Sequence, residues 1–114
     1  MERRSPRFTV WLPVRVDELQ EGVAVSHDAS DRGMMLVTAS RLEIGAEVTI
    51  VLTVPPEGGE ERRVHGHVVR VEPNLEDPQG MWPHRMAVEF DHKVPEVERV
   101  LAALEAKGFA ERKR

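Results

Sequence analysis

The chain has no cysteine and no tyrosine, and aromatic residues make up only 4% of its 114 residues. The absence of cysteine excludes a disulfide framework and thiolate chemistry at a metal or redox centre. Basic residues are not in excess either, because 16 lysines and arginines stand against 20 acidic residues and leave a formal net charge of -4. A general nucleic-acid-binding surface requires excess positive charge and, for single strands, exposed aromatic side chains. We therefore expect no nucleic-acid partner.

Long apolar runs are also missing. The longest apolar β-like run, Val48 to Val54, is too short to cross a bilayer as a helix, and the first residues show no signal peptide. The sequence thus predicts a cytoplasmic protein without membrane insertion. Its length and its hydrophobic content of 40% fit one globular domain with a modest core.

Alternation of apolar and polar residues predicts a mainly β fold. Between Phe8 and Val16 every second residue from Val10 onward is apolar, which is typical of a half-buried strand. Further strands are expected at residues 23–25, 34–37, 47–54, 62–71 and 85–90, with a hairpin loop at 57–60 and a longer insertion at 73–83. Both faces of residues 62–71 carry apolar side chains, so the orientation of that strand stays open. Five or six short strands indicate a sandwich or a small barrel.

A helix is expected after the strands. Its apolar stripe consists of Val94, Val97, Val100, Leu101 and Leu104. Pro95 suits a first helical turn, and Gly108 suits the position just past the end. We expect the helix to pack on the strands, with docking of a partner as the alternative. The basic residues 112–114 are expected to form a solvated terminus.

Two polar clusters flank the first predicted hairpin. In the first, Arg3, Arg4 and Arg7 supply guanidinium groups that grip phosphate, face the O6/N7 edge of guanine, or stack on a base. In the second, Asp28 offers a carboxylate for the N1–H and N2–H groups of guanine, and Ser30 offers a small hydroxyl. Both of these side chains would alternatively form a local turn.

The end of the second cluster completes this hypothesis. Gly33 permits a positive φ, so the sequence predicts a sharp backbone turn beside a ligand at this residue. Asp31 and Arg32 occupy the intervening positions and are expected to be exposed.

Together the clusters carry a family resemblance. The RxxxR pattern of Arg3 and Arg7, followed by the DxSxxG pattern of Asp28, Ser30 and Gly33, resembles the PilZ domain, a bacterial receptor module for cyclic di-GMP. The resemblance implies a six-stranded antiparallel β-barrel with a C-terminal α-helix. It also implies a single domain over residues 1–114, divided into a flexible arginine-bearing arm (1–8), a barrel (9–91), a helix (94–107) and a basic tail (108–114).

The resemblance also implies a function in second-messenger signalling. The chain would bind cyclic di-GMP and change its surface to regulate a motility, secretion or signalling protein. The ligand-binding residues would be Arg3, Arg4, Arg7, Asp28, Ser30 and Gly33. The alternative is an adaptor of the same fold that does not bind the nucleotide and docks its partner through the helix or the Met81-Trp82 loop.

The sequence indicates catalytic and metal sites much more weakly than it indicates the ligand site of the two polar clusters. His65 and His67 form an H-x-H pair that could contact a metal, but the sequence offers no evident third ligand, so we expect no metal and no cofactor. His27, Asp28 and Ser30 have the residue types of a hydrolytic triad, yet such triads gather their groups from separate elements. We therefore expect a protein that is not an enzyme. The sequence does not decide whether Trp11 covers a ligand or the helix.

Overall fold

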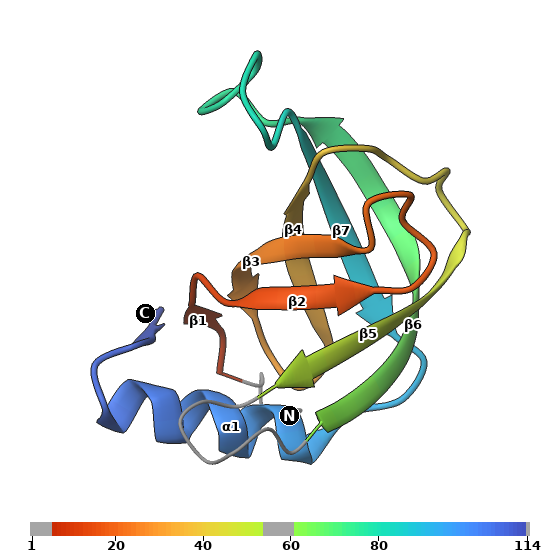
Figure 1. The fold of residues 1–114 in the computed structure, drawn as a ribbon. Helices are drawn as coiled ribbons and strands as arrows, with labels where there is room; N and C mark the ends of the chain where they lie inside the picture. The colour runs from red at the N-terminus through yellow and green to blue at the C-terminus, as the bar shows by residue number, and fades with distance from the viewer. Residues whose placement is uncertain (1–5, 54–60, 114) are drawn as a thin grey trace, which may run out of the picture.

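A computed structural model describes residues 6–53 and 61–113 (Figure 1). Its elements, in chain order, are β1 (Phe8–Thr9), β2 (Pro13–Val16), β3 (Val23–Ala29), β4 (Gly33–Thr38), β5 (Glu47–Thr53), β6 (Glu61–Pro73), β7 (His84–Phe90), α1 (Pro95–Ala106) and β8 (Glu111–Arg112). Arg3, Arg4 and the loop predicted at 57–60 lie outside the described residues.

Six of the strands close into an antiparallel barrel. They follow one another in the order β2, β5, β6, β7, β4 and β3, and pairing of β3 with β2 completes the circle (Figure 1). Closure removes the open sheet edges that would otherwise invite pairing with another chain. The predicted mainly β fold, a six-stranded barrel followed by a helix, is confirmed.

One side of each barrel strand fills the interior. On β2, Val14 and Val16 are buried while Pro13 and Arg15 are exposed, as the period of two requires. The same cluster of buried side chains includes Ala24, Leu36, Ile50, Leu52, Val64, Val68, Met86, Val88 and Phe90. Burying each large apolar side chain contributes roughly 1.5–3 kcal/mol before the loss of chain entropy is subtracted.

A β-bulge in β6 explains why its sequence pattern is ambiguous. The register with β7 shifts between Val68 and Arg70. Before the bulge, Val64 and Val68 are buried in the core; after it, Val71 packs against the core although it has the opposite parity. The extra residue, Val69, is exposed on the outer face.

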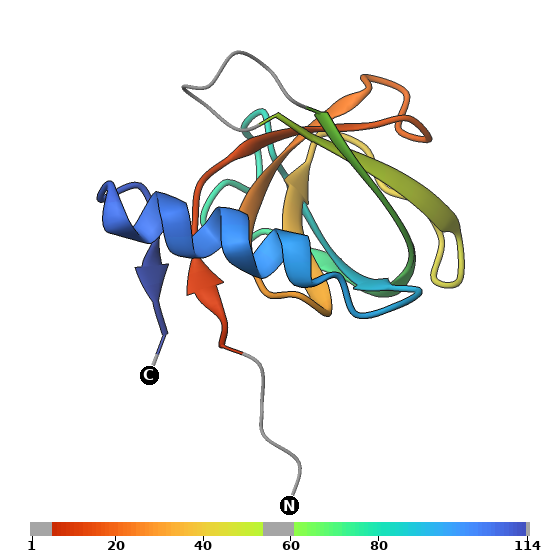
Figure 2. The same ribbon diagram turned by 90° about the horizontal axis from the view of Figure 1, so that it is seen from below.

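Helix α1 lies across one end of the barrel (Figure 2). Val97, Leu101 and Leu104 are buried in the same cluster as the strand residues, so the expected packing on the barrel is confirmed. Gly108 adopts φ +82° just after the helix, in agreement with its predicted role. Within the described parts of the chain, no helix is long and apolar enough to cross a membrane.

The strand predicted from Phe8 to Val16 is divided into β1 and β2. Between them, the buried hydroxyl of Ser26 accepts the backbone N–H of Leu12 at 3.0 Å and donates to the carbonyl of Val10. The Ser26 hydroxyl of β3 thus takes the place of some backbone hydrogen bonds between β3 and the residues that connect β1 to β2. This local exchange leaves the apolar alternation intact, so the alternation alone does not reveal the break. Pro13, which lacks an N–H and begins β2, is the local sign of an irregularity here.

The described residues of the C-terminal tail are exposed, as predicted, but they are not frayed, because they pair with β1. Strand β8 pairs with β1, which places Arg112 opposite Phe8 and Glu111 opposite Thr9 (Figure 2). The guanidinium carbon of Arg112 lies 4.9 Å from the centre of the Phe8 ring. Phe8, which was expected at the end of a flexible arm, is itself fully buried. The two ends of the chain therefore stabilise each other.

We predict that Leu101→Ala lowers the free energy of unfolding by about 2–5 kcal/mol, because it opens a cavity between α1 and the barrel. Urea denaturation measures this change. The exposed Arg99 on the same helix provides the control, since Arg99→Ala should change stability by no more than about 0.5 kcal/mol. Equal effects of the two substitutions would contradict the packing of α1 on the barrel.

Candidate functional site

A second β-bulge positions Asp28. The register between β3 and β4 shifts between Ser26 and Asp28, so His27 is the additional residue. In a regular strand Asp28 would share the inward face of Ala24 and Ser26. The bulge instead pairs Asp28 with Met35, which is not part of the core cluster, and turns Ala29 inward. The carboxylate is thereby directed to the outside of the barrel.

The Asp28 carboxylate is held by cations from both ends of the chain. Its Oδ1 atom accepts a hydrogen bond from Arg7 Nε at 3.0 Å and lies 2.8 Å from Arg7 Nη2 in an ion pair. Its Oδ2 atom lies 3.1 Å from Lys113 Nζ and 3.6 Å from His27 Nδ1. The Asp28 side chain is 11% exposed, whereas the side chains of Arg7 and Lys113 are 46% and 40% exposed. The two cations thus cover the carboxylate on its solvent side.

These contacts determine the charge of Asp28. Burial alone would raise the pKa of the carboxyl, but the charges and hydrogen bonds of Arg7 and Lys113 outweigh burial and hold the pKa below its ordinary value. Asp28 is therefore ionised at neutral pH. In this state both of its oxygens accept hydrogen bonds and neither donates.

Gly33 begins β4 but does not have the predicted positive φ. Among the described residues, the glycines with positive φ are Gly22, Gly45 and Gly108. Gly33 is needed for a different reason: a Cβ atom there would lie 2.5 Å from the carbonyl oxygen of Val88 on β7. Because backbone atoms cannot give way as a flexible side chain does, only glycine allows β4 and β7 to pair this closely.

The loop between Asp28 and Gly33 is held by its own hydrogen bonds. Ser30 is buried, its N–H donates to the carbonyl of Gly33 at 2.9 Å, and its hydroxyl oxygen accepts the N–H of Arg32 at 3.1 Å. Ser30 thus has the turn-forming role that the sequence offered as an alternative. The expected exposure of Asp31 is wrong, because its side chain is fully buried and lies 3.5 Å from Lys93 Nζ. Arg32 is exposed, as expected.

A depression of about 780 Å³ lies beside this loop, on the outer face of β4, β7 and β6. Arg7, Asp28 and Gly33 line one part of it. Apolar side chains such as Met35 and Val69 line another part, and Val69 is exposed there because of the bulge in β6. A surface that combines cations, a carboxylate and apolar side chains suits an anionic ligand with an aromatic ring system.

Residues 2–106 match the family model of the PilZ domain. The chain belongs to the PilZ domain family. Solved structures show the same fold at low sequence identity. The PilZ domain of YcgR from Escherichia coli, determined with c-di-GMP, is similar with a TM-score of 0.65, 17% identity, and coverage of 95% of each chain.

Two longer proteins also contain this PilZ fold. The inhibitor of motility MotI/DgrA from Bacillus subtilis is similar with a TM-score of 0.72 and 16% identity over 95% of the present chain. MrkH from K. pneumonia, determined in complex with c-di-GMP, gives a TM-score of 0.58 and 19% identity over 94%. The present chain spans 52% of the first protein and 51% of the second. No curated protein sequence matches it.

The structure brings residues of both PilZ motifs together, but not all of them. Arg7 of the first motif contacts Asp28 of the second, and Gly33 lies beside the same depression. The hydroxyl of Ser30 is bonded to its own loop. Arg3 and Arg4 lie outside the described residues, so their predicted contacts stay predictions.

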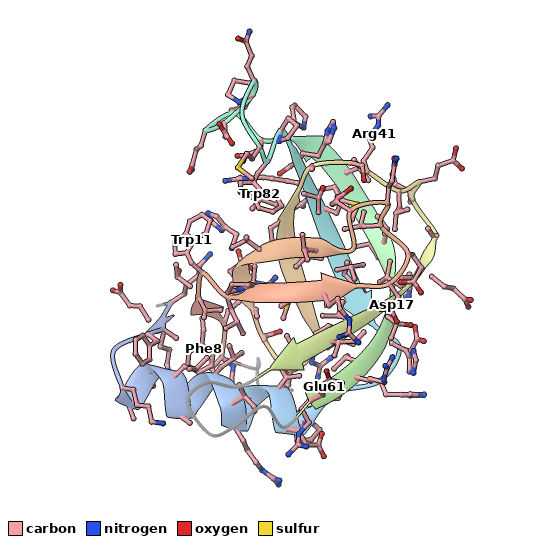
Figure 3. All side chains as sticks on the ribbon, viewed as in Figure 1. Phe8, Trp11, Asp17, Arg41, Glu61 and Trp82 are labelled. Carbon is pink, nitrogen blue, oxygen red and sulfur yellow. The ribbon has the colours of Figure 1, made fainter. Side chains whose placement is uncertain are left out.

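Other residues singled out in the sequence are not among those that line the depression. Among the described residues no group of three potential ligands could hold a metal ion; His67 Nδ1 lies 3.3 Å from Asp91 Oδ1. Trp11 stands edge-on to His27 with ring centres 4.8 Å apart, on the side of the barrel near β1 (Figure 3). Trp82 belongs to the loop at the end of the barrel opposite α1 (Figure 3).

Sequence reasoning assigned Lys113 to a solvated tail and missed its contact with Asp28. This residue follows β8, and its N–H donates to the carbonyl of Arg7 at 2.8 Å, which continues the pairing of β8 with β1. The ammonium group reaches Asp28 across 85 positions of sequence. A lysine in a short basic tail carries no local signal of such a distant contact.

We predict that Asp28→Asn lowers the free energy of unfolding at neutral pH by about 1 kcal/mol, because Arg7 and Lys113 lose their charged partner. The folded pKa of Asp28 is depressed, so its contribution is fully present above the unfolded value and is lost as the pH falls through the folded value. The deficit of the variant should therefore shrink below about pH 4.

Urea denaturation at a series of pH values measures this difference. Glu43→Gln, at an exposed turn, controls for the loss of one negative charge. A deficit of Asp28→Asn that stayed constant down to acid pH would show that shape, and not charge, explains it.

Proposed function

We propose that this PilZ domain is a receptor that binds cyclic di-GMP and acts through binding alone. The observation that supports the proposal best is the direct contact between Arg7 and Asp28, one residue from each PilZ motif, at the edge of a depression of about 780 Å³. The likeness to the PilZ domains of YcgR and MrkH, whose structures were determined with c-di-GMP, adds support at the level of the fold.

The proposed binding exchanges one set of charge-assisted hydrogen bonds for another. The two phosphates and two guanine bases of the ligand are complementary to cations and to an ionised carboxylate. Arg7 would leave Asp28 for a phosphate or the O6/N7 edge of guanine, and Asp28 would accept from the N1–H and N2–H groups of a base. Arg3 and Arg4 are proposed to add cations, and Ser30 and Gly33 to form the adjacent wall.

The same exchange of partners by Arg7 would change the surface that a partner protein contacts. Arg7 precedes β1, and its carbonyl is bonded to Lys113 after β8, so a movement of Arg7 would alter the surface formed by both chain ends. We propose that a motility, secretion or signalling protein recognises this altered surface. MotI, which has the same fold, is described as an inhibitor of motility.

A second candidate is an adaptor that does not bind the nucleotide. Residues 74–83 form a loop stabilised by its own hydrogen bonds, including Asn74 Nδ2 to the carbonyl of Trp82 at 2.7 Å and the Trp82 N–H to Asp77 Oδ2 at 3.1 Å. This loop presents Leu75 and Met81 with 81% and 73% of their surface exposed. A hydrogen-bonded loop with exposed apolar side chains suits the docking of a partner protein.

We predict that Arg7→Ala weakens the binding of cyclic di-GMP by at least about tenfold, because the lost interactions are charge-assisted hydrogen bonds. Isothermal titration calorimetry measures the affinity. Arg99→Ala removes the same charge from the surface of α1 and should leave the affinity close to that of the unchanged protein. Undiminished binding by Arg7→Ala would remove this residue from the site.

Thermal unfolding separates the receptor from the adaptor. A ligand that binds only the folded state stabilises it, by about 2.7 kcal/mol when its concentration is one hundred times the dissociation constant. We therefore predict that cyclic di-GMP raises the Tm and that GMP at equal concentration raises it much less. An unchanged Tm at saturating cyclic di-GMP would favour the adaptor.

A further inference from the structure

We propose that Lys113 is a further ligand-binding residue, which the C-terminal strand brings to the site formed by the two PilZ motifs. In the structure its ammonium group pairs with Asp28. When the nucleotide binds, the same ammonium group moves from Asp28 to a phosphate of the ligand. This inference rests on the proposed function, because the ligand is cyclic di-GMP. It adds a cation that neither motif contains.

The position of Lys113 is fixed by its backbone. Its N–H donates to the carbonyl of Arg7 at 2.8 Å, directly after the pairing of Arg112 with Phe8. Arg112 strengthens this attachment, because it lies over the ring of Phe8 and also contacts Glu105 on α1 at 3.3 Å. Lys113 therefore begins its side chain beside Arg7, whichever partner the ammonium group selects.

The charges at the site favour a change of partner for Lys113, from Asp28 to a phosphate. Arg7 and Lys113 contact different oxygens of one carboxylate, Oδ1 and Oδ2. If a guanine edge occupies both oxygens of Asp28, the two cations lose their partner at the same time. The nucleotide supplies two phosphates, so each cation gains an anion in exchange. An ammonium group on a flexible four-carbon chain changes partners with little rearrangement, since its three donors rotate freely.

Two other roles for Lys113 are distinguishable from this one. As a purely structural counter-ion, it would contribute little to stability and nothing to affinity, because the pair is partly exposed. As a competitor, it would occupy Asp28 Oδ2 and obstruct the guanine, so its removal would strengthen binding. We propose instead that Lys113 contacts a phosphate, so that removing its ammonium group weakens binding. A dianionic ligand gains more from a cation at this position than from a free carboxylate oxygen.

The test compares Lys113→Met with Lys113→Arg by calorimetric titration with cyclic di-GMP. Both variants keep the backbone N–H that bonds to Arg7, but only the second keeps a cation. We expect Lys113→Met to bind on the order of tenfold more weakly at low salt, with a smaller deficit at high salt, and Lys113→Arg to retain most of the affinity. Arg99→Ala controls for the loss of one positive charge elsewhere.

The possible outcomes separate this inference from the proposed function. Unchanged or tighter binding by Lys113→Met, while the unchanged protein binds, would overturn the role of Lys113 alone. No binding by the unchanged protein would overturn both proposals. Hydrogen exchange at the amide of residue 113 checks that β8 stays paired in Lys113→Met; if this amide loses protection and Lys113→Arg binds as weakly as Lys113→Met, the ammonium group is not the cause and the inference fails.

Discussion

A carboxylate that is almost covered by protein must be compensated by nearby positive charge, and Asp28 imposes this requirement on the whole molecule. Removing an ion from water is costly, and the cost is offset only by well-placed partners. Arg7 and Lys113 meet the requirement from opposite ends of the chain. The Asp28–Lys113 pair thus adds to the backbone pairing and the Arg112–Phe8 contact that join β8 to β1.

Two features of the barrel prepare this arrangement. The additional residue in β3, His27, turns Asp28 outward at the point where β3 meets β4. The close approach of Gly33 to the backbone of Val88 keeps β4 and β7 in register beside it. A carboxylate on the outer face would be unremarkable in isolation. Next to a depression lined by arginine and apolar side chains, it suits the ligand-binding role proposed above.

Much of this was predictable, because local periodicity determines the elements. Alternation on Val14 and Val16, and helical spacing of Val97 and Leu101, indicate the barrel strands and α1 with their buried faces. The motifs predicted that Arg7 and Asp28 belong to one ligand site, but they did not predict the direct contact between these side chains. The errors concern contacts that periodicity does not describe. Lys113 pairs with Asp28 across 85 positions of sequence, Asp31 is buried and contacts the distant Lys93, and Gly33 is required by a neighbouring strand and not by its own φ. The outcomes for Arg3 and Arg4 remain predictions.

The adjacency of β1 and β8 has a practical consequence for anyone who modifies the protein. Strand β1 pairs directly with β3 at Asp28, and β8 is the next strand outward, so an affinity tag, a fluorescent protein or a surface attachment built onto either strand would disturb the part of the sheet that holds Asp28. A fluorophore pair at the two ends would report the separation of these strands directly. Permanent labels intended to be silent belong elsewhere, for example at the turn around Gly45.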